Sequence, residues 1–186
     1  MTARSPALTA YRLGTRLAEP FAGRALRARA GRGKEDPQRI AERMGFASRP
    51  RPEGPLVWLH GVSVGESLSL LPLAEALRRE RPGLTVLLTS GTRTSAEVLA
   101  TRAPEGAIHQ YAPVDAPGAV ARFLDHWRPD AGVFVESELW PNLLLAARSR
   151  RVKLALVSAR MTEKSAERWR RTPGAAKALL ATFSLI

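Results

Sequence analysis

The sequence contains no cysteine, which excludes a disulfide framework, a thiolate nucleophile and a zinc site with cysteine ligands. It also lacks a long apolar run, because the longest stretch without a charged residue, Gly54–Gly65, is too short to cross a bilayer as a helix. Aromatic residues make up only 6% of the chain, while 45% of the residues are hydrophobic and 25% are charged. That balance is typical of a globular protein and excludes a wholly disordered or low-complexity chain.

Acidic residues are scarce relative to basic ones, and the imbalance is concentrated at the N-terminus. The net charge is +12, and residues 1–51 hold twelve Lys or Arg and four Asp or Glu, so they carry +8 of it. A basic segment favours anionic partners such as phospholipid head groups, nucleic acid or phosphorylated substrates, although an arginine-rich composition alone would also produce it. A nucleic-acid-binding module is the less favoured interpretation, because the few aromatic residues do not interleave with the basic run.

Residues 7–29 have a helical pattern, which we expect to divide into two pieces around Pro20, because proline suits a helix start better than an interior. Apolar residues spaced by four share one face of this helix, and arginines project from another (Leu13, Leu17 and Phe21; Arg12, Arg16 and Arg27). Two interpretations remain open. The apolar face lies in a membrane interface beside anionic lipid, or it packs on the protein's own core.

From residue 55 onward, short apolar runs alternate with helical patterns. The runs predict strands at Leu56–Leu59, Leu84–Thr89, Ile108–Tyr111, Ala131–Val135 and Val152–Val157. Short strands that are almost wholly apolar are covered on both faces, so we expect an α/β fold with an open, parallel, Rossmann-like sheet. Residues 1–50 would then form a basic helical segment and linker, and residues 51–186 the α/β domain. Because the chain stops within an apolar run, we expect it to be the first half of a longer protein.

Open parallel sheets bind ligands at the carboxyl ends of their strands, so the residues that follow each strand are the candidate site. The first strand leads into a glycine-rich turn, Gly61–Glu66, in which Glu66 either caps the next helix or acts as a general base. The second strand leads into a turn that ends at Ser95. Its amides, hydroxyls and arginine suit an anion or a sugar, or simply cap a helix.

Two carboxylates follow the fourth strand. Glu136 and Glu138 precede Trp140, and carboxylates beside an aromatic side chain suit a polyhydroxylated sugar. Arg160, which follows the fifth strand, adds a cation at the same edge. We interpret His60 as a structural histidine, and no paired spacing of histidines and carboxylates indicates a metal site. The sequence also has no Asp-x-Asp pair, which argues against a metal–diphosphate site.

Five segments occur in an order that resembles a known family. They are His60–Glu66, Thr89–Thr92, Phe123–Asp130, Glu136–Asn142 and Ala159–Met161. Together they resemble the N-terminal half of the 3-deoxy-D-manno-octulosonic acid (Kdo) transferases, inner-membrane glycosyltransferases of lipopolysaccharide assembly. The resemblance is close over residues 55–186 and loose over the basic N-terminus. The sequence departs from the family's pattern at Gly61, where alanine is frequent, and at Ser158, where asparagine is frequent.

The resemblance implies a GT-B architecture, in which two Rossmann-like domains face each other across a cleft. It implies that this half binds the acceptor, a lipid A precursor, and that a C-terminal half binds the donor, CMP-Kdo. Transfer is expected to invert the anomeric centre without a metal or other cofactor, and this half by itself is expected to be inactive. The enzyme is expected to be peripheral, on an anionic membrane surface at the cytoplasmic face of the bacterial inner membrane. The alternative is another GT-B glycosyltransferase with a lipid acceptor.

The resemblance also assigns roles to residues. Glu66 matches the family's proposed general base, which deprotonates an acceptor hydroxyl. The residues expected to bind substrate are Ser63, Gly65, Ser90, Gly91, Thr92, Arg93, Glu136, Glu138, Trp140 and Arg160. Of these, Arg93 and Arg160 are expected to contact a lipid A phosphate or the Kdo carboxylate, and only Arg160 lies in a segment that matches the family.

Overall fold

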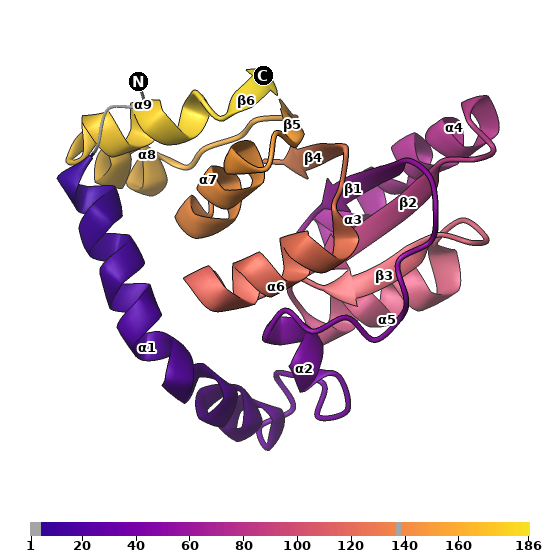
Figure 1. The fold of residues 1–186 in the computed structure, drawn as a ribbon, viewed down its shortest axis with the longest axis horizontal. Coiled ribbons are helices and arrows are strands. Elements are labelled where there is room, and N and C mark those ends of the chain that lie inside the picture. The colour runs from indigo at the N-terminus through magenta and orange to yellow at the C-terminus, as the bar shows by residue number, and fades with distance from the viewer. Residues whose placement is uncertain (1–4, 137–138) are drawn as a thin grey trace.

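Figure 1 shows the computed structural model, which describes residues 5–136 and 139–186. Within those residues, six parallel strands form one sheet in the order β3-β2-β1-β4-β5-β6. The strands are β1 (Leu56–His60), β2 (Thr85–Ser90), β3 (Ile108–Tyr111), β4 (Ala131–Val135), β5 (Lys153–Val157) and β6 (Phe183–Leu185). The predicted open, parallel, Rossmann-like sheet is therefore confirmed, and β3 and β4 have the bounds expected from the sequence.

Helices cover both faces of the sheet. They are α1 (Pro6–Ala30), α2 (Ile40–Arg43), α3 (Val64–Ser69), α4 (Leu71–Glu80), α5 (Arg93–Arg102), α6 (Pro117–Trp127), α7 (Pro141–Ser149), α8 (Glu163–Arg170) and α9 (Pro173–Leu180). Successive side chains of a strand point to opposite faces, so β1 contributes to two cores. Trp58 packs in the core that includes Phe123 of α6 and Leu143 of α7. Leu59 packs in the other, which includes Leu99 of α5.

Helix α1 runs without interruption through Pro20, so the predicted division into two pieces is wrong. A proline inside a helix removes a backbone hydrogen bond and costs about 3 kcal/mol. Contacts with α6 offset that cost directly beside the proline. Glu19 accepts a hydrogen bond from the backbone N–H of Gly118 at 2.8 Å and another from Arg122 at 3.0 Å. These partners lie 99 and 103 residues further along the chain, so no local pattern indicates them.

The same helix docks through polar side chains together with Leu8 and Leu26, and turns its stripe of Leu13, Leu17 and Phe21 outward. On the docked side, Tyr11 donates a hydrogen bond to Asp115 at 3.0 Å. On the outer side, Leu13, Leu17 and Phe21 are 58%, 67% and 71% exposed. The interpretation in which this apolar face packs on the protein's own core is therefore wrong. Within residues 5–136 and 139–186, no helix is both long enough and apolar enough to cross a membrane.

Strand β3 lies at one edge of the sheet, and the N-terminal segment covers it with charged side chains. Glu42 accepts a hydrogen bond from the backbone N–H of Tyr111 at 2.8 Å, and Arg39 donates one to the backbone carbonyl of His109 at 3.1 Å. Arg39 and Glu42 also form an ion pair of 2.8 Å. These side chains replace a neighbouring strand and so protect the edge from pairing with another chain. Part of the N-terminal charge therefore has a structural role.

Candidate active site

The strand order reverses direction between β1 and β4. The chain proceeds from β1 to β2 and β3 on one side of the sheet, and from β4 to β5 and β6 on the other. β1 and β4 are neighbours, and His60 pairs with Phe134 near their carboxyl ends. The crevice outside two such strands is where open parallel sheets bind ligands. Glu66 follows β1 and Glu136 follows β4, so the fold brings the segments that carry two predicted site residues to this switch point.

Glu66 is a buried carboxylate, 7% exposed, in the first turn of α3. Its Oε2 accepts a hydrogen bond from the backbone N–H of Val62 at 2.8 Å. Its Oε1 accepts from the Ser63 hydroxyl at 2.7 Å and from the Ser63 N–H at 3.4 Å. Ser63 Oγ in turn accepts from the Glu66 N–H at 3.2 Å, which completes a capping box. The capping role is therefore confirmed, and the same bonds fix the direction of the carboxylate, as a catalytic carboxylate requires.

Glu136 comes directly after β4 in an unusual backbone conformation. Its φ of 58° lies in the left-handed region, which costs a non-glycine residue about 1 kcal/mol. Its N–H donates to the carbonyl of Val157 at 3.2 Å, and its side chain is exposed. Strained backbone of this kind is concentrated at functional sites. The predicted site residue Glu138 and its neighbour Ser137 lie outside the described residues.

The turn after β2 supports the turn that holds Glu66. The Gly91 N–H and the Ser95 hydroxyl both donate to the backbone carbonyl of Val62, at 3.1 and 3.2 Å. A Cβ at Gly91 would lie 2.5 Å from Val62 Cγ1, so this close approach requires glycine. Thr92 accepts the N–H of Ser95 at 3.1 Å and caps α5. The capping alternative for this turn is therefore confirmed.

Two other predicted site residues at the end of β2 have partners away from Glu66. Ser90 is fully buried, and its hydroxyl bonds Nε2 of His109 on β3 at 2.9 Å. Arg93 pairs with Glu97 at 2.9 Å and lines a separate hollow of about 360 Å³ beside Tyr111. The structure therefore places these two side chains toward β3 and not toward the switch point.

A buried hydrogen-bonded network lies beneath the switch point. Trp58 Nε1 donates to Thr89 Oγ1 at 2.8 Å, and Thr89 Oγ1 lies 2.8 Å from His60 Nδ1. Burial, and to a smaller extent the charge of Arg43, lowers the pKa of His60 to about 3. The ring is therefore neutral, with Nδ1 hydrogen-bonded to the Thr89 hydroxyl, whereas Nε2 has no hydrogen-bond partner within the described part of the chain. His60 is thus structural, as expected, but only one of its nitrogens is satisfied.

The other predicted site residues lie around this network or on the surface. The ring of Trp140 meets the ring of His60 edge-on, with 5.4 Å between centroids. Ser63 and Gly65 are exposed on either side of Val64, and Arg160 is exposed after β5. In the part of the chain that the structure describes, no three histidine, aspartate or glutamate side chains are grouped so as to hold a metal ion. Sequence reasoning missed the Trp58–Thr89–His60 network, whose only signal was a hydroxyl at the end of a buried strand.

The fold and the site define a Rossmann-type α/β domain with acidic residues at its switch point. A family model described as "3-Deoxy-D-manno-octulosonic-acid transferase (kdotransferase)" matches residues 38–186. The chain belongs to this transferase family, as the sequence motifs predicted, and the family is one of glycosyltransferases.

Named relatives agree with this assignment. The "Probable 3-deoxy-D-manno-octulosonic acid transferase, mitochondrial" of Arabidopsis thaliana is 42% identical over 159 residues, which cover 86% of this chain and 36% of the relative. The "3-deoxy-D-manno-octulosonic acid transferase" of Rickettsia bellii is 39% identical over 152 residues, covering 82% of this chain and 36% of the relative. That of Haemophilus influenzae is 33% identical over 152 residues, covering 80% and 35%. The chain thus spans about a third of the length of the curated relatives it matches.

Proposed function

We propose that this chain is the acceptor-binding half of an enzyme that transfers Kdo from CMP-Kdo to a lipid A precursor. The observation that carries the proposal is the position of Glu66 and Glu136 at the β1–β4 switch point of a chain from this family. A second Rossmann-like domain would bind the donor across the cleft, in the GT-B arrangement. Residues 51–186 form the acceptor domain, and residues 1–50 the basic segment that holds it at the membrane.

Glu66 is the proposed general base. An acceptor hydroxyl would replace the Ser63 hydroxyl at Oε1, while the backbone N–H groups of Val62 and Ser63 keep the carboxylate in place. The acceptor oxygen then bonds the anomeric carbon of Kdo as its proton passes to Glu66. The bond from that carbon to the phosphate oxygen breaks, and CMP leaves with the bonding electrons. Attack on the face opposite the leaving group inverts the anomeric centre, and the proton transfer needs no metal.

The surroundings of the remaining candidate residues suit them to different roles in the proposed site. Ser63, Gly65 and Thr92 are exposed near the turn of Glu66 and are proposed to contact the acceptor. Glu136, Glu138 and Trp140 are proposed to bind its sugar hydroxyls, with Arg160 for a phosphate or carboxylate. Gly91 would contribute through the turn that it stabilises, Ser90 through its bond to His109, which ties that turn to β3, and Arg93 through its surface charge.

The experiment compares Glu66→Gln with the unmodified protein in a polypeptide that joins this chain to a donor-binding half. We expect the initial rate of Kdo transfer from CMP-Kdo to fall by about two to four orders of magnitude, the usual contribution of a general base. Binding of the lipid A precursor to the 186-residue chain should change by less than threefold, because the amide retains the shape and most of the cap. Transfer by the 186-residue chain without the donor half, or near-normal transfer by Glu66→Gln, would contradict the proposal.

The outward face of α1 supports the proposed peripheral membrane association. Leu13, Leu17 and Phe21 are exposed on it, and Arg16 and Arg24 lie within one helical turn of that stripe. An apolar stripe flanked by cations is the pattern of a helix that lies in an anionic membrane interface. The acceptor is a lipid, so this association would bring the active site to it at the cytoplasmic face of the inner membrane.

Sedimentation with phosphatidylglycerol vesicles tests this association. Leu17→Gln with Phe21→Gln should weaken binding by about tenfold or more, since each buried apolar side chain contributes roughly 1.5–3 kcal/mol. The matched control is Met161→Gln with Leu180→Gln, which removes two apolar side chains of 40% and 39% exposure elsewhere and should change binding less than twofold. Equal losses in both proteins, or tighter binding to random duplex DNA than to vesicles, would contradict the association.

A further inference from the structure

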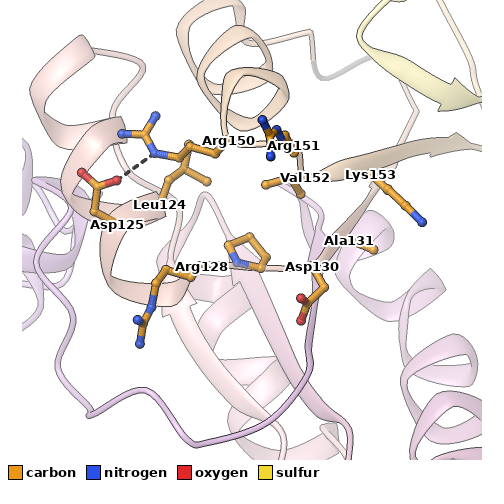
Figure 2. A pocket seen from close by; sticks show the side chains of 10 residues that line it. Leu124, Asp125, Arg128, Asp130, Ala131, Arg150, Arg151, Val152 and Lys153 are labelled. Carbon is orange, nitrogen blue, oxygen red and sulfur yellow. Dashed lines mark hydrogen bonds and ion pairs between the residues drawn. The ribbon is translucent and has the colours of Figure 1, made fainter.

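A cavity of about 650 Å³ lies at the amino ends of β4 and β5. Glu66 lies at the other end of the strands, beyond their carboxyl ends. Figure 2 shows it from close by, with side chains from the ends of α6 and α7 and from the starts of the two strands around it. Its apolar lining includes Leu124, Pro129 and Val152, all buried. The volume falls within the range of small-molecule sites, which run from about 300 to 1,000 Å³. The cavity is therefore large enough for a metabolite and has an apolar floor.

Cations surround this floor. Arg128, Arg151 and Lys153 line the cavity, and among the described residues none of their side chains has a hydrogen bond or ion pair. Arg150, by contrast, is engaged by Asp125 at 2.8 Å. Asp130 uses Oδ2 to accept the N–H of Leu56 at 2.8 Å. Figure 2 shows Arg128 and Lys153 on opposite sides of the hollow, with their charged ends pointing apart. Both side chains are long and unpaired, so a phosphoryl group, which accepts several charge-assisted hydrogen bonds at once, would draw them inward.

Two of these cations stand where glycine is the usual residue. Arg128 has φ 43° and follows α6, and Arg151 has φ 63° and follows α7. Their backbone N–H groups close the helix ends by donating to Leu124 at 2.9 Å and to Arg148 at 2.9 Å. Glycine would make the same backbone bonds without the steric cost of a left-handed residue. Arginine at both positions accepts that steric cost and adds a cation at the rim of the cavity.

We propose that this cavity binds a small, soluble organic phosphate. Its phosphoryl group would contact Arg128, Arg151 and Lys153, and its apolar or planar part would cover Pro129 and Val152. A hydroxyl or amino group on the same molecule would donate to Oδ1 of Asp130, the oxygen that the Leu56 N–H does not use. The helix macrodipole gives the two arginines a competing structural role, because cations stabilise helix C-termini. The inference is independent of Kdo transfer and concerns the opposite edge of the sheet.

Isothermal titration of the 186-residue chain with ADP tests the proposal, because ADP has an aromatic part, hydroxyls and phosphates and is not a part of the proposed donor. We expect saturable 1:1 binding with a Kd of about 0.1–1 mM, the scale of a site with few contacts. Arg128→Gly with Arg151→Gly should weaken binding at least tenfold and yet raise Tm by about 2–8 °C, because glycine relieves the left-handed strain. Lys153→Gln, on an exposed strand end, should weaken binding about threefold.

Matched variants separate a site from general charge. Arg81→Gln with Arg102→Gln removes two exposed cations from the ends of α4 and α5 and should leave ADP binding within twofold. Arg128→Lys with Arg151→Lys keeps the charge and should retain binding within about threefold. No saturable ADP binding, equal weakening by the control pair, or a lower Tm in the double glycine variant would overturn the proposal. So would binding to phosphatidylglycerol vesicles that depends on Arg128 and Arg151 in a chain that does not bind ADP, since the phosphate would then belong to lipid.

Discussion

The carboxyl ends of β4 and β5 (the carboxyl edge) and their amino ends (the amino edge) both carry non-glycine residues with positive φ, but the side chains at the two edges differ in charge. Among the described residues, the non-glycine residues with positive φ are Arg128, Glu136, Arg151 and Ser158. All four flank β4 or β5, two before the strands and two directly after them. At the carboxyl edge they present a carboxylate and a hydroxyl, and at the amino edge they present two guanidinium groups. Under the two proposals, strain of about 1 kcal/mol is retained at Arg128, Glu136 and Arg151 because each side chain contacts a ligand.

The edges differ in how firmly their polar groups are held. At the carboxyl edge, Glu66 is buried and accepts hydrogen bonds from Val62 and Ser63, and His60 is locked by Thr89. At the amino edge, the free cations are exposed and rest on an apolar floor. A preorganised carboxylate suits catalysis, in which geometry must be fixed before the reaction, whereas loosely held cations suit binding of an anion from solution.

The largest effect on stability is expected from pH, at the carboxyl edge. The pKa of His60 falls from its ordinary 6.5 to about 3 in the folded protein because the ring is buried. Between pH 7 and pH 5 the unfolded ring gains a proton that the folded ring refuses, so folding loses about 2 kcal/mol from this residue. Burial also lowers the pKa of His109 to about 3, so that ring contributes a comparable loss over the same pH range. Urea unfolding at the two pH values should therefore show a loss that is about 2 kcal/mol smaller in His60→Gln than in the unmodified chain. The same pH dependence in both proteins would mean that His60 is not held neutral.

A smaller effect is expected at Glu136. Glu136→Gly should raise the free energy of unfolding by up to about 1 kcal/mol, because glycine adopts a φ of 58° freely. It should weaken binding of the lipid A precursor about tenfold, because the carboxylate is lost. Glu136→Gln is the matched control: it should weaken acceptor binding comparably without the gain in stability. If Glu136→Gly gains stability and keeps full acceptor binding, the strained residue has no part in the site.

Much of the architecture could be predicted because it depends on local pattern. A continuous apolar run identified β4 to the residue, and the alternation of such runs with helices identified a parallel sheet. The bounds of β3 were also predicted, although His109 and Gln110 interrupt its apolar pattern. The sequence could not show that α1 continues through Pro20, because the partners that hold Glu19 lie about a hundred residues away along the chain. Which face of α1 packs inward could not be predicted for the same reason. Polar contacts such as Tyr11–Asp115 turn the apolar face outward, whereas an amphipathic helix usually packs its apolar face on the core.

The place of the candidate site residues in the fold could be predicted, but most of their contacts could not. Strand ends and the rule for parallel sheets located Glu66 and Glu136, and the capping role of Thr92 follows from a hydroxyl three residues before Ser95. The hydrogen bond between Ser90 and His109 could not be predicted from the sequence, because the two residues meet only when β2 pairs with β3. The amino-edge cavity also escaped sequence reasoning, since left-handed backbone at an arginine has no signature in the sequence.

Hydrogen exchange of the 186-residue chain, with and without saturating lipid A precursor, tests the central claim most directly. The claim is that the acceptor binds at the carboxyl ends of β1 and β4. Backbone amides of Val62–Glu66 and of Glu136 should exchange at least fivefold more slowly with acceptor, while those of residues 127–131 and 150–153 keep their rates. Protection confined to the amino edge, or acceptor binding that leaves Val62–Glu66 unchanged, would contradict the account.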